Sequence, residues 1–92
     1  MRIIAGSKKG MKLLAPRGST TRPYSDRVKE SVFNIMMKWD LPAEAMVADL
    51  FCGTGSMGLE ALSRGARFVT FVDRDRQVID LLEKNIAKAG FV

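Results

Sequence analysis

Residues 49–58 read Asp-Leu-Phe-Cys-Gly-Thr-Gly-Ser-Met-Gly, a glycine-rich stretch between a short apolar run and an amphipathic segment. The run at 46–51 has the length and the β-branched and aromatic content of a buried strand, and the residues after the glycines have helical spacing. Gly53 and Gly55 can adopt backbone angles closed to other residues, and they have no Cβ to hold a ligand away. The stretch therefore predicts a strand, a tight turn and a helix, with the turn against a small polar ligand.

Two acidic residues narrow the choice of ligand. Asp49 stands beside the glycines, where it would repel a dinucleotide's pyrophosphate but would suit a ligand with an ammonium group. S-adenosylmethionine carries an ammonium and a sulfonium and has no phosphate. Asp73 ends a second apolar run at 68–73, twenty residues after Gly53, where an acid accepts hydrogen bonds from ribose hydroxyls. The residues favour S-adenosylmethionine; a dinucleotide, or a turn without any ligand, remain the alternatives.

Three helices are expected around these two strands. Ser25 is a good N-cap for a helix that runs to about Lys38, and a second helix covers about 57–64. Asp75 predicts the N-cap of a third helix, which ends at Ala89 before Gly90. The expected core face of the first helix consists of Val28, Val32, Ile35, Met36 and Trp39.

The two strands are fewer than a doubly wound nucleotide fold requires. Parallel strands are normally covered on both faces and paired on both edges. We therefore interpret the sequence as the front part of a larger α/β domain, preceded by an N-terminal β-hairpin and a helix. Uncovered apolar surface, expected at Val28, Val32, Leu81 and Leu82, predicts that the isolated chain self-associates.

Composition favours a cytoplasmic protein. Apolar residues make up 47% of the chain and charged residues 27%, no apolar stretch approaches the length of a transmembrane helix, and the N-terminus lacks a secretory pattern. Cys52 is the only cysteine and there is no histidine, which excludes histidine catalysis, an internal disulfide and histidine-containing zinc sites from these residues. No metal site is predicted. Without a histidine partner, Cys52 is interpreted as a small residue that fits the turn, not as a nucleophile.

Positive charge is concentrated near the N-terminus. Residues 1–30 hold eight basic and two acidic residues, whereas 31–92 hold seven basic and eight acidic ones. We divide the chain into a basic arm at 1–24, with a β-hairpin at 2–15, and a nucleotide-fold part at 25–92. Basic groups on such an arm can contact RNA phosphates, although a solvated lysine turn that discourages aggregation is the alternative. The candidate RNA-binding residues are Arg2, Lys8, Lys9, Lys12, Arg17 and Arg22.

Four motifs resemble the RsmD family of bacterial methyltransferases. They are Arg2-Ile-Ile-Ala-Gly6, Thr21-Arg-Pro23 with Asp26-Arg-Val-Lys-Glu30, the turn at 49–55, and Gly58-Leu-Glu-Ala-Leu-Ser-Arg-Gly-Ala66. The resemblance implies a Rossmann-like class I fold, S-adenosylmethionine as cofactor, and methylation of a guanine N2 in small-subunit ribosomal RNA. It implies contact of the hairpin with ribosomal RNA or the small ribosomal subunit. The implied cofactor-binding residues are Asp49, Phe51, Cys52, Gly53, Thr54, Gly55, Ser56, Asp73 and Arg74.

One family motif does not occur in this sequence. The family's catalytic tetrapeptide, Asp or Asn followed by Pro-Pro-Tyr or Pro-Pro-Phe, contains adjacent prolines, and the prolines here are Pro16, Pro23 and Pro42. No catalytic residue is therefore assigned, and we expect the 92 residues to be inactive on their own. Three functions stay open: the cofactor part of a methyltransferase, a dinucleotide-binding part of an oxidoreductase, and a stand-alone RNA-binding or assembly module.

Overall fold

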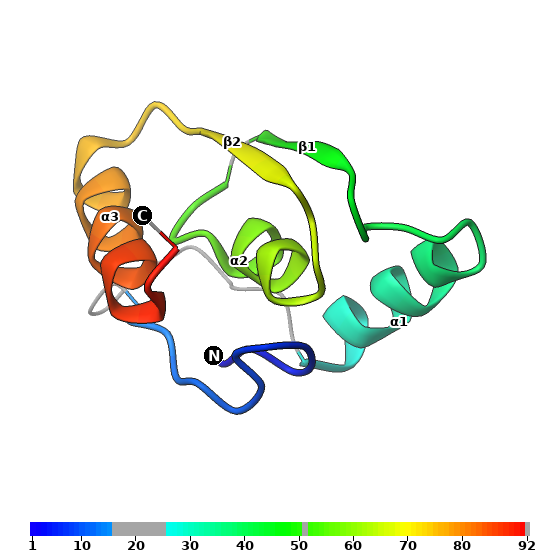
Figure 1. Cartoon of the computed structure of the whole chain (residues 1–92). Coiled ribbons are helices and arrows are strands. Elements are labelled where there is room, and N and C mark those ends of the chain that lie inside the picture. Colours follow the sequence, from blue (N-terminus) through cyan, green and yellow to red (C-terminus); the bar gives the residue numbers. More distant parts are fainter. Residues whose placement is uncertain (16–25, 51, 92) are drawn as a thin grey trace.

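The computed structural model describes residues 1–15, 26–50 and 52–91. Within them lie α1 Asp26–Met37, β1 Met46–Leu50, α2 Ser56–Ser63, β2 Phe68–Val72 and α3 Arg76–Ala89. Figure 1 shows the helices on one side of the sheet, with segment 1–15 beyond α2 on the side away from the strands. None of these helices is long and apolar enough to cross a membrane.

The sheet is parallel, as the sequence predicts. β1 pairs with β2 from Met46 opposite Phe68 to Leu50 opposite Val72, and α2 connects the two strands. Parallel strands need such a crossover because the chain must return to the same end of the sheet. The predicted small α/β arrangement of two parallel strands joined by a helix is confirmed; Phe51 lies outside the described residues.

Only one face of the sheet is covered within the described part of the chain. Val47, Asp49 and Phe71 are half-buried on the α2 side. The opposite face exposes large apolar side chains, with Met46 77%, Leu50 63%, Phe68 56% and Val72 48% exposed. The interpretation of the two runs as buried strands therefore holds for the face toward α2 and is wrong for the opposite face, where the described residues provide no layer.

The core forms where segment 1–15, α2 and α3 meet. Its buried residues are Ile3, Leu13, Cys52, Leu59 and Leu82. Leu82 is only 3% exposed, so the expectation that it needs a cover from outside the chain is wrong. The N-terminal arm therefore belongs to the packed body of the protein.

The predicted N-terminal hairpin is reduced to one antiparallel bridge, between Arg2 and Lys12. The backbone turns back on itself, with the N–H of Ile3 donating to the carbonyl of Met11 at 2.9 Å. Beyond this bridge the arm bonds to α2: the Glu60 carboxylate accepts from the N–H groups of Ile4 and Ala5. Side-chain acceptors of α2 thus satisfy backbone donors that a regular hairpin would use for pairing.

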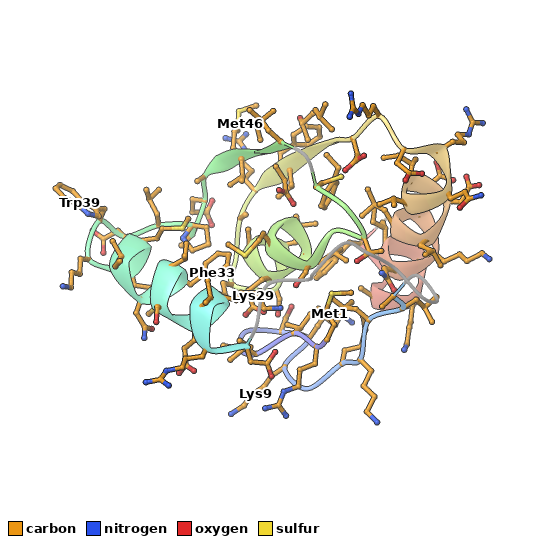
Figure 2. The ribbon with its side chains drawn as sticks, turned by 180° about the vertical axis from the view of Figure 1, so that it is seen from behind. Met1, Lys9, Lys29, Phe33, Trp39 and Met46 are labelled. Atoms are coloured by element: carbon orange, nitrogen blue, oxygen red, sulfur yellow. The ribbon has the colours of Figure 1, made fainter. Side chains whose placement is uncertain are left out.

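The predicted core face of α1 is correct only in part. Val32 and Met36 are half-buried, whereas Val28, Ile35 and Trp39 are 47%, 59% and 75% exposed. The fully buried side chains of the helix are Lys29 and Phe33. Figure 2 shows Trp39 at the periphery, far from Lys29 and Phe33. The reason is electrostatic, since Glu60 of α2 faces α1 and pairs with Lys29, which rotates the helix relative to the apolar pattern. The helix ends at Met37, one residue before the predicted end, and the predicted N-cap Ser25 lies outside the described residues.

The predicted ends of α3 are confirmed. The Asp75 side chain accepts from the N–H groups of Gln77 and Val78. It thereby pairs two of the four backbone donors that have no partner within the helix at its N-terminus. Gly90 has a φ of 74°, the left-handed conformation that commonly ends a helix. Both caps follow from local sequence alone.

Candidate functional site

The carboxyl ends of β1 and β2 meet at the glycine turn. The N–H of Cys52 donates to the carbonyl of Val72 at 2.9 Å, which extends the strand pairing to the start of the turn. Gly53 and Gly55 have φ angles of 56° and 91°, in the left-handed region. The N–H of Gly55 closes the turn on the carbonyl of Cys52 at 2.9 Å. The sequence therefore needs glycine at both positions, as predicted.

Asp73 holds the turn from the end of β2. One carboxylate oxygen accepts from the N–H of Gly53 at 2.9 Å, and the other accepts from the N–H of Asp75 at 2.9 Å. These two N–H groups hold the pKa of Asp73 below its usual range, with Asp75 contributing most. An ionised carboxylate thus lies at the edge of the turn, with lone pairs left to accept from a ligand's hydroxyls.

Asp49 accepts a hydrogen bond from the first turn of α2, the helix that follows the glycine turn. Gly55, at the N-cap of α2, has no side chain with which to cap it, and Asp49 accepts from the N–H of Gly58 in the first turn at 2.9 Å. Burial raises the pKa of Asp49, and the Asp73 charge adds to this, while the Gly58 bond opposes it. A half-buried carboxylate in this position favours a cationic neighbour.

The glycines differ in what lies above their backbone. A Cβ on Gly55 would overlap Leu82, and one on Gly58 would overlap the Phe71 ring. A Cβ on Gly53 would meet no atom within 4 Å. Gly55 and Gly58 are therefore required for packing, whereas Gly53 leaves open space beside the carboxylate of Asp73.

Three predicted cofactor residues turn their side chains inward. Cys52, Thr54 and Ser56 are 8%, 8% and 6% exposed. The Ser56 hydroxyl accepts from the Nζ of Lys29 at 3.0 Å, and the Thr54 hydroxyl donates to the Met1 sulfur at 3.7 Å. These residues can offer a ligand their backbone only. Arg74 is exposed next to Asp73 in the chain.

The buried thiol of Cys52 is not set up as a nucleophile. Burial, followed by the charges of Asp49 and Asp73, raises its pKa to about 11. A thiol with this pKa is almost entirely protonated at neutral pH, and the thiolate is the reactive form. The geometry therefore supports the interpretation of Cys52 as a small residue that fits the turn.

Asn85 supports the turn from beneath and was missed from the sequence. It is fully buried, and its amide donates to the carbonyls of Thr54 and Leu14, each at 3.1 Å. Its side-chain oxygen accepts from the N–H of Leu14 at 2.7 Å. The available signal was its position on α3, three residues after Leu82 and four before Ala89, which places a polar group on the buried stripe.

A buried ionic cluster of Lys29, Glu60 and Arg64 was also missed. The Nζ of Lys29 donates to the carbonyl of Arg2 at 2.6 Å and lies 3.3 Å from the Glu60 carboxylate. Arg64 bonds to the same carboxylate at 2.8 Å. Since Lys29 also bonds to Ser56, the cluster connects the N-terminal arm to the first residue of α2, directly after the glycine turn.

The predicted RNA-binding residues lie on the arm where they are described. Arg2, Lys9 and Lys12 are exposed and Lys8 is half-buried, while Arg17 and Arg22 lie outside the described residues. Arg2 pairs with Asp26 at 3.0 Å. Among the residues that the structure describes, no group of three or more acidic, cysteine or histidine side chains could hold a metal ion.

Comparison with known proteins identifies the family. Residues 1–92 match the family described as Conserved hypothetical protein 95. Ribosomal RNA small subunit methyltransferase D of Escherichia coli (strain K12) is 45% identical over 94 residues, which cover 98% of this chain and 46% of that protein. The protein of the same name from Haemophilus influenzae is 45% identical over 86 residues, which cover 94% of this chain and 44% of that protein.

A solved structure shares the fold. The structure of yhhF from Escherichia coli, described as a methyltransferase, superposes with a TM-score of 0.86 at 39% identity and covers 98% of this chain and 47% of that one. The chain thus spans about half the length of the relatives it matches. Because the family match extends over all 92 residues, the chain belongs to the RsmD family.

Proposed function

We propose that this chain is the cofactor-binding part of an S-adenosylmethionine-dependent RNA methyltransferase that methylates a guanine N2 in small-subunit ribosomal RNA, in the cytoplasm. The proposed domain is Rossmann-like, and the chain covers 46% of the Escherichia coli relative. The names of those relatives and the resemblance of the motifs support this substrate. Methylation of small-subunit ribosomal RNA by the 92-residue chain alone would contradict the proposal that these residues only bind the cofactor.

The observation that carries the proposal is the arrangement around Gly53. Open space above its Cα adjoins the ionised Asp73, whose oxygens retain lone pairs for the two ribose hydroxyls of an adenosine. Asp49 supplies the negative charge that a methionine ammonium would need. When bound, S-adenosylmethionine supplies a methyl group on a sulfonium, which is transferred by in-line displacement. The residues of this chain would bind and orient it, which is the main catalytic contribution that such a reaction needs.

The dinucleotide alternative is opposed by the same geometry. A pyrophosphate at such a turn would bind the free N–H groups at the start of the helix. Here the Asp49 carboxylate already accepts from the N–H of Gly58 in that first turn, and its charge would repel a phosphate. The stand-alone RNA-binding module does not account for the open space at Gly53.

Calorimetric titration tests the choice between these functions. We expect S-adenosylmethionine and its demethylated product to bind at one site and NAD to show no saturable binding. Binding of NAD in preference to S-adenosylmethionine would replace the proposal with the oxidoreductase alternative. Salt-dependent RNA binding without binding of either cofactor would favour the RNA module.

Gly53→Ala is expected to weaken S-adenosylmethionine binding by at least about tenfold while lowering the stability of the fold no more than Gly90→Ala does. The new methyl group meets no protein atom, so the cost to folding is that of the left-handed backbone, on the order of 1–2 kcal/mol. Gly90→Ala is the matched control, because Gly90 has a φ of 74° and equally open surroundings but lies at the end of α3. Equal affinity in both variants would remove Gly53 from the site.

S-adenosylmethionine binding should weaken as the pH falls below neutral. The pKa of Asp49 is raised by burial, and a cationic ligand favours its ionised form, so protonation of Asp49 opposes binding. The loss should begin above the range in which an ordinary aspartate titrates. Calorimetry from pH 7.5 downward measures this, with Asp49→Asn as the variant whose affinity should depend much less on pH. A parallel decline in both proteins would exclude Asp49 as the titrating group.

We also propose that the isolated chain self-associates through the uncovered face of the sheet. On the exposed face of the two paired strands, Met46 lies opposite Phe68 and Leu50 opposite Val72, with Ala48 and Thr70 between the two pairs. Large exposed apolar side chains grouped on one face are a surface that soluble monomers seldom present. Sedimentation equilibrium should therefore show association that increases with concentration and that Leu50→Lys reduces. A monomer at all concentrations would contradict this proposal.

A further inference from the structure

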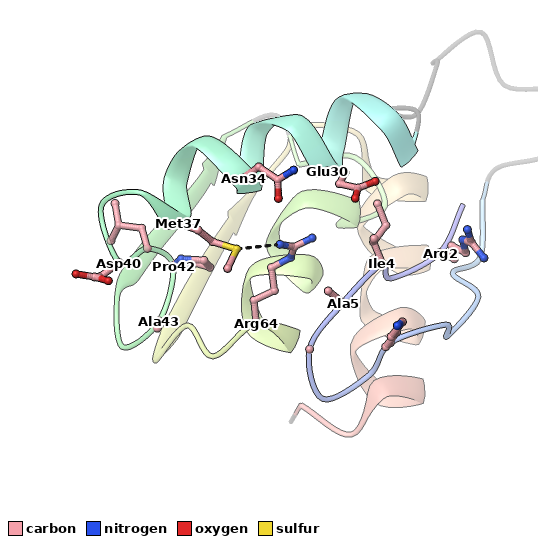
Figure 3. A pocket seen from close by; sticks show the side chains of 13 residues that line it. Arg2, Ile4, Ala5, Glu30, Asn34, Met37, Asp40, Pro42, Ala43 and Arg64 are labelled. Atoms are coloured by element: carbon pink, nitrogen blue, oxygen red, sulfur yellow. Dashed lines mark hydrogen bonds between the residues drawn. The ribbon is translucent and has the colours of Figure 1, made fainter.

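A second open region lies away from the glycine turn, between α1, the N-terminal arm and the connector before β1. It is a pocket of about 800 Å³, within the range of small-molecule and nucleotide sites. Figure 3 shows Glu30 and Asn34 reaching into it from α1, and Arg64 facing them from the end of α2. Residues from four separate segments of the chain, the arm, α1, the connector before β1 and the end of α2, thus converge on one space.

Two of these side chains have free hydrogen-bonding groups. Glu30 and Asn34 are four residues apart on the same side of α1, and both are exposed. Within residues 1–15, 26–50 and 52–91, neither has a hydrogen bond or an ion pair through its side chain. They offer a carboxylate and an amide side by side, which is the combination that hydrogen-bonds to the edge of a nucleobase.

Arg64 is held in place at the back of the pocket. Its Nε bonds to Glu60 at 2.8 Å, its guanidinium lies 4.7 Å from the centre of the Phe33 ring, and its Nη1 donates to the Met37 sulfur at 3.7 Å. In the described part of the chain Nη2 has no hydrogen bond, and Arg64 lines the pocket with a side chain that is 9% exposed. A planar guanidinium fixed in this way can stack on a base or donate to it.

The walls and the rim complete the site. Ile4, Met37 and Pro42 provide apolar surface, and two cations also line the pocket, Lys9 and Arg2, the latter paired with Asp26. Apolar and guanidinium surface for stacking, polar groups for the base edge, and cations for the phosphates are the parts of a single-stranded RNA contact.

We propose that this pocket binds one base of the RNA substrate, with the adjoining phosphates on Arg2 and Lys9. This inference rests on the proposed function. Arg64 follows the last residue of α2, whereas the glycine turn precedes the first, and eight helical residues span about 12 Å. The base in the pocket is therefore not the one that receives the methyl group but a neighbour that positions the strand.

Fluorescence anisotropy with a labelled single-stranded heptanucleotide RNA containing all four bases tests the proposal. Glu30→Gln should weaken binding about fivefold although it removes a negative charge, because a charged acceptor for the base is replaced by a weaker, neutral one. Asn34→Ala should weaken it to a similar extent. Glu83→Gln is the matched control: it removes the same charge from an exposed position on α3 and should leave the affinity unchanged or slightly increased.

The salt dependence separates base from phosphate contacts. Glu30→Gln and Asn34→Ala should leave the slope of log affinity against log salt concentration unchanged. Lys9→Ala should make this slope smaller in magnitude by about one, which corresponds to one counterion fewer released on binding. If Glu30→Gln binds RNA as tightly as Glu83→Gln, the pocket proposal is wrong. Titration of the same samples with S-adenosylmethionine tests the proposed function separately. If only the pocket proposal is wrong, cofactor binding is still observed. If the proposed function is wrong, cofactor binding is absent.

Discussion

Asp73→Ala is expected to weaken S-adenosylmethionine binding by about ten- to a hundredfold, the largest effect of any single exchange at the glycine turn. Two losses add up in this variant. The ribose hydroxyls lose a charged acceptor, and hydrogen bonds to charged groups are stronger than neutral ones. The N–H of Gly53 also loses its partner at 2.9 Å, which frees the turn that the ligand must contact. Isothermal titration calorimetry at neutral pH measures the change.

Two further variants separate these contributions. Asp73→Asn retains an oxygen that can accept from Gly53 but loses the charge, so its affinity should fall between those of the unaltered protein and Asp73→Ala. Glu83→Ala removes a carboxylate from an exposed position of α3 and should leave the affinity unchanged. An Asp73→Ala variant that binds as tightly as Glu83→Ala would show that Asp73 only shapes the turn.

Glu60→Gln is expected to lower the free energy of unfolding by about 3–5 kcal/mol, the range for breaking a buried ion pair. The Glu60 side chain is fully buried and accepts from Ile4, Ala5 and Arg64 while facing the charge of Lys29 at 3.3 Å. A glutamine in its place turns one acceptor into a donor that faces other donors. Since small domains have total stabilities of about 5–15 kcal/mol, urea denaturation should show a strongly lowered midpoint.

Glu83→Gln is again the matched control, because it makes the same chemical change on an exposed side chain and should stay within about 0.5 kcal/mol of the unaltered protein. The Glu60 variant should also release the arm, whose backbone donors at Ile4 and Ala5 depend on it. Faster amide exchange at these two residues reports this release. A Glu60→Gln variant with unaltered stability would mean that the ionic cluster is not required for the fold.

The features that the sequence predicted correctly are those encoded in short stretches. The apolar runs at 46–51 and 68–73 specify strands, and Asp75 and Gly90 cap α3 through bonds to residues close by in the chain. The glycine turn belongs to this group, because left-handed backbone at Gly53 and Gly55 depends on the residue type itself. The candidate cofactor site could therefore be located before its geometry was known.

The features that the sequence did not predict depend on partners far along the chain. Lys29 is buried on α1 because Glu60, 31 positions later, neutralises it, and this contact exposes Val28 and Ile35 against the apolar pattern. The arm forms one bridge instead of two strands because Glu60 and Ser63 bind its backbone. Asn85 supports Thr54 from 31 positions away. A periodicity argument cannot find such contacts, since it weighs side chains only against neighbours on their own element.

Cofactor binding at the glycine turn is tested most directly by titrating the ¹⁵N-labelled chain with S-adenosylmethionine and following the amide chemical shifts. We expect saturable shifts concentrated at Gly53, Asp73 and Asp75, whose amides and carboxylate lie beside the open space at the turn. These shifts should disappear in Gly53→Ala and persist in Gly90→Ala. Absence of saturable shifts, or shifts confined to residues away from the turn, would contradict the assignment of this chain as the cofactor-binding part of a methyltransferase.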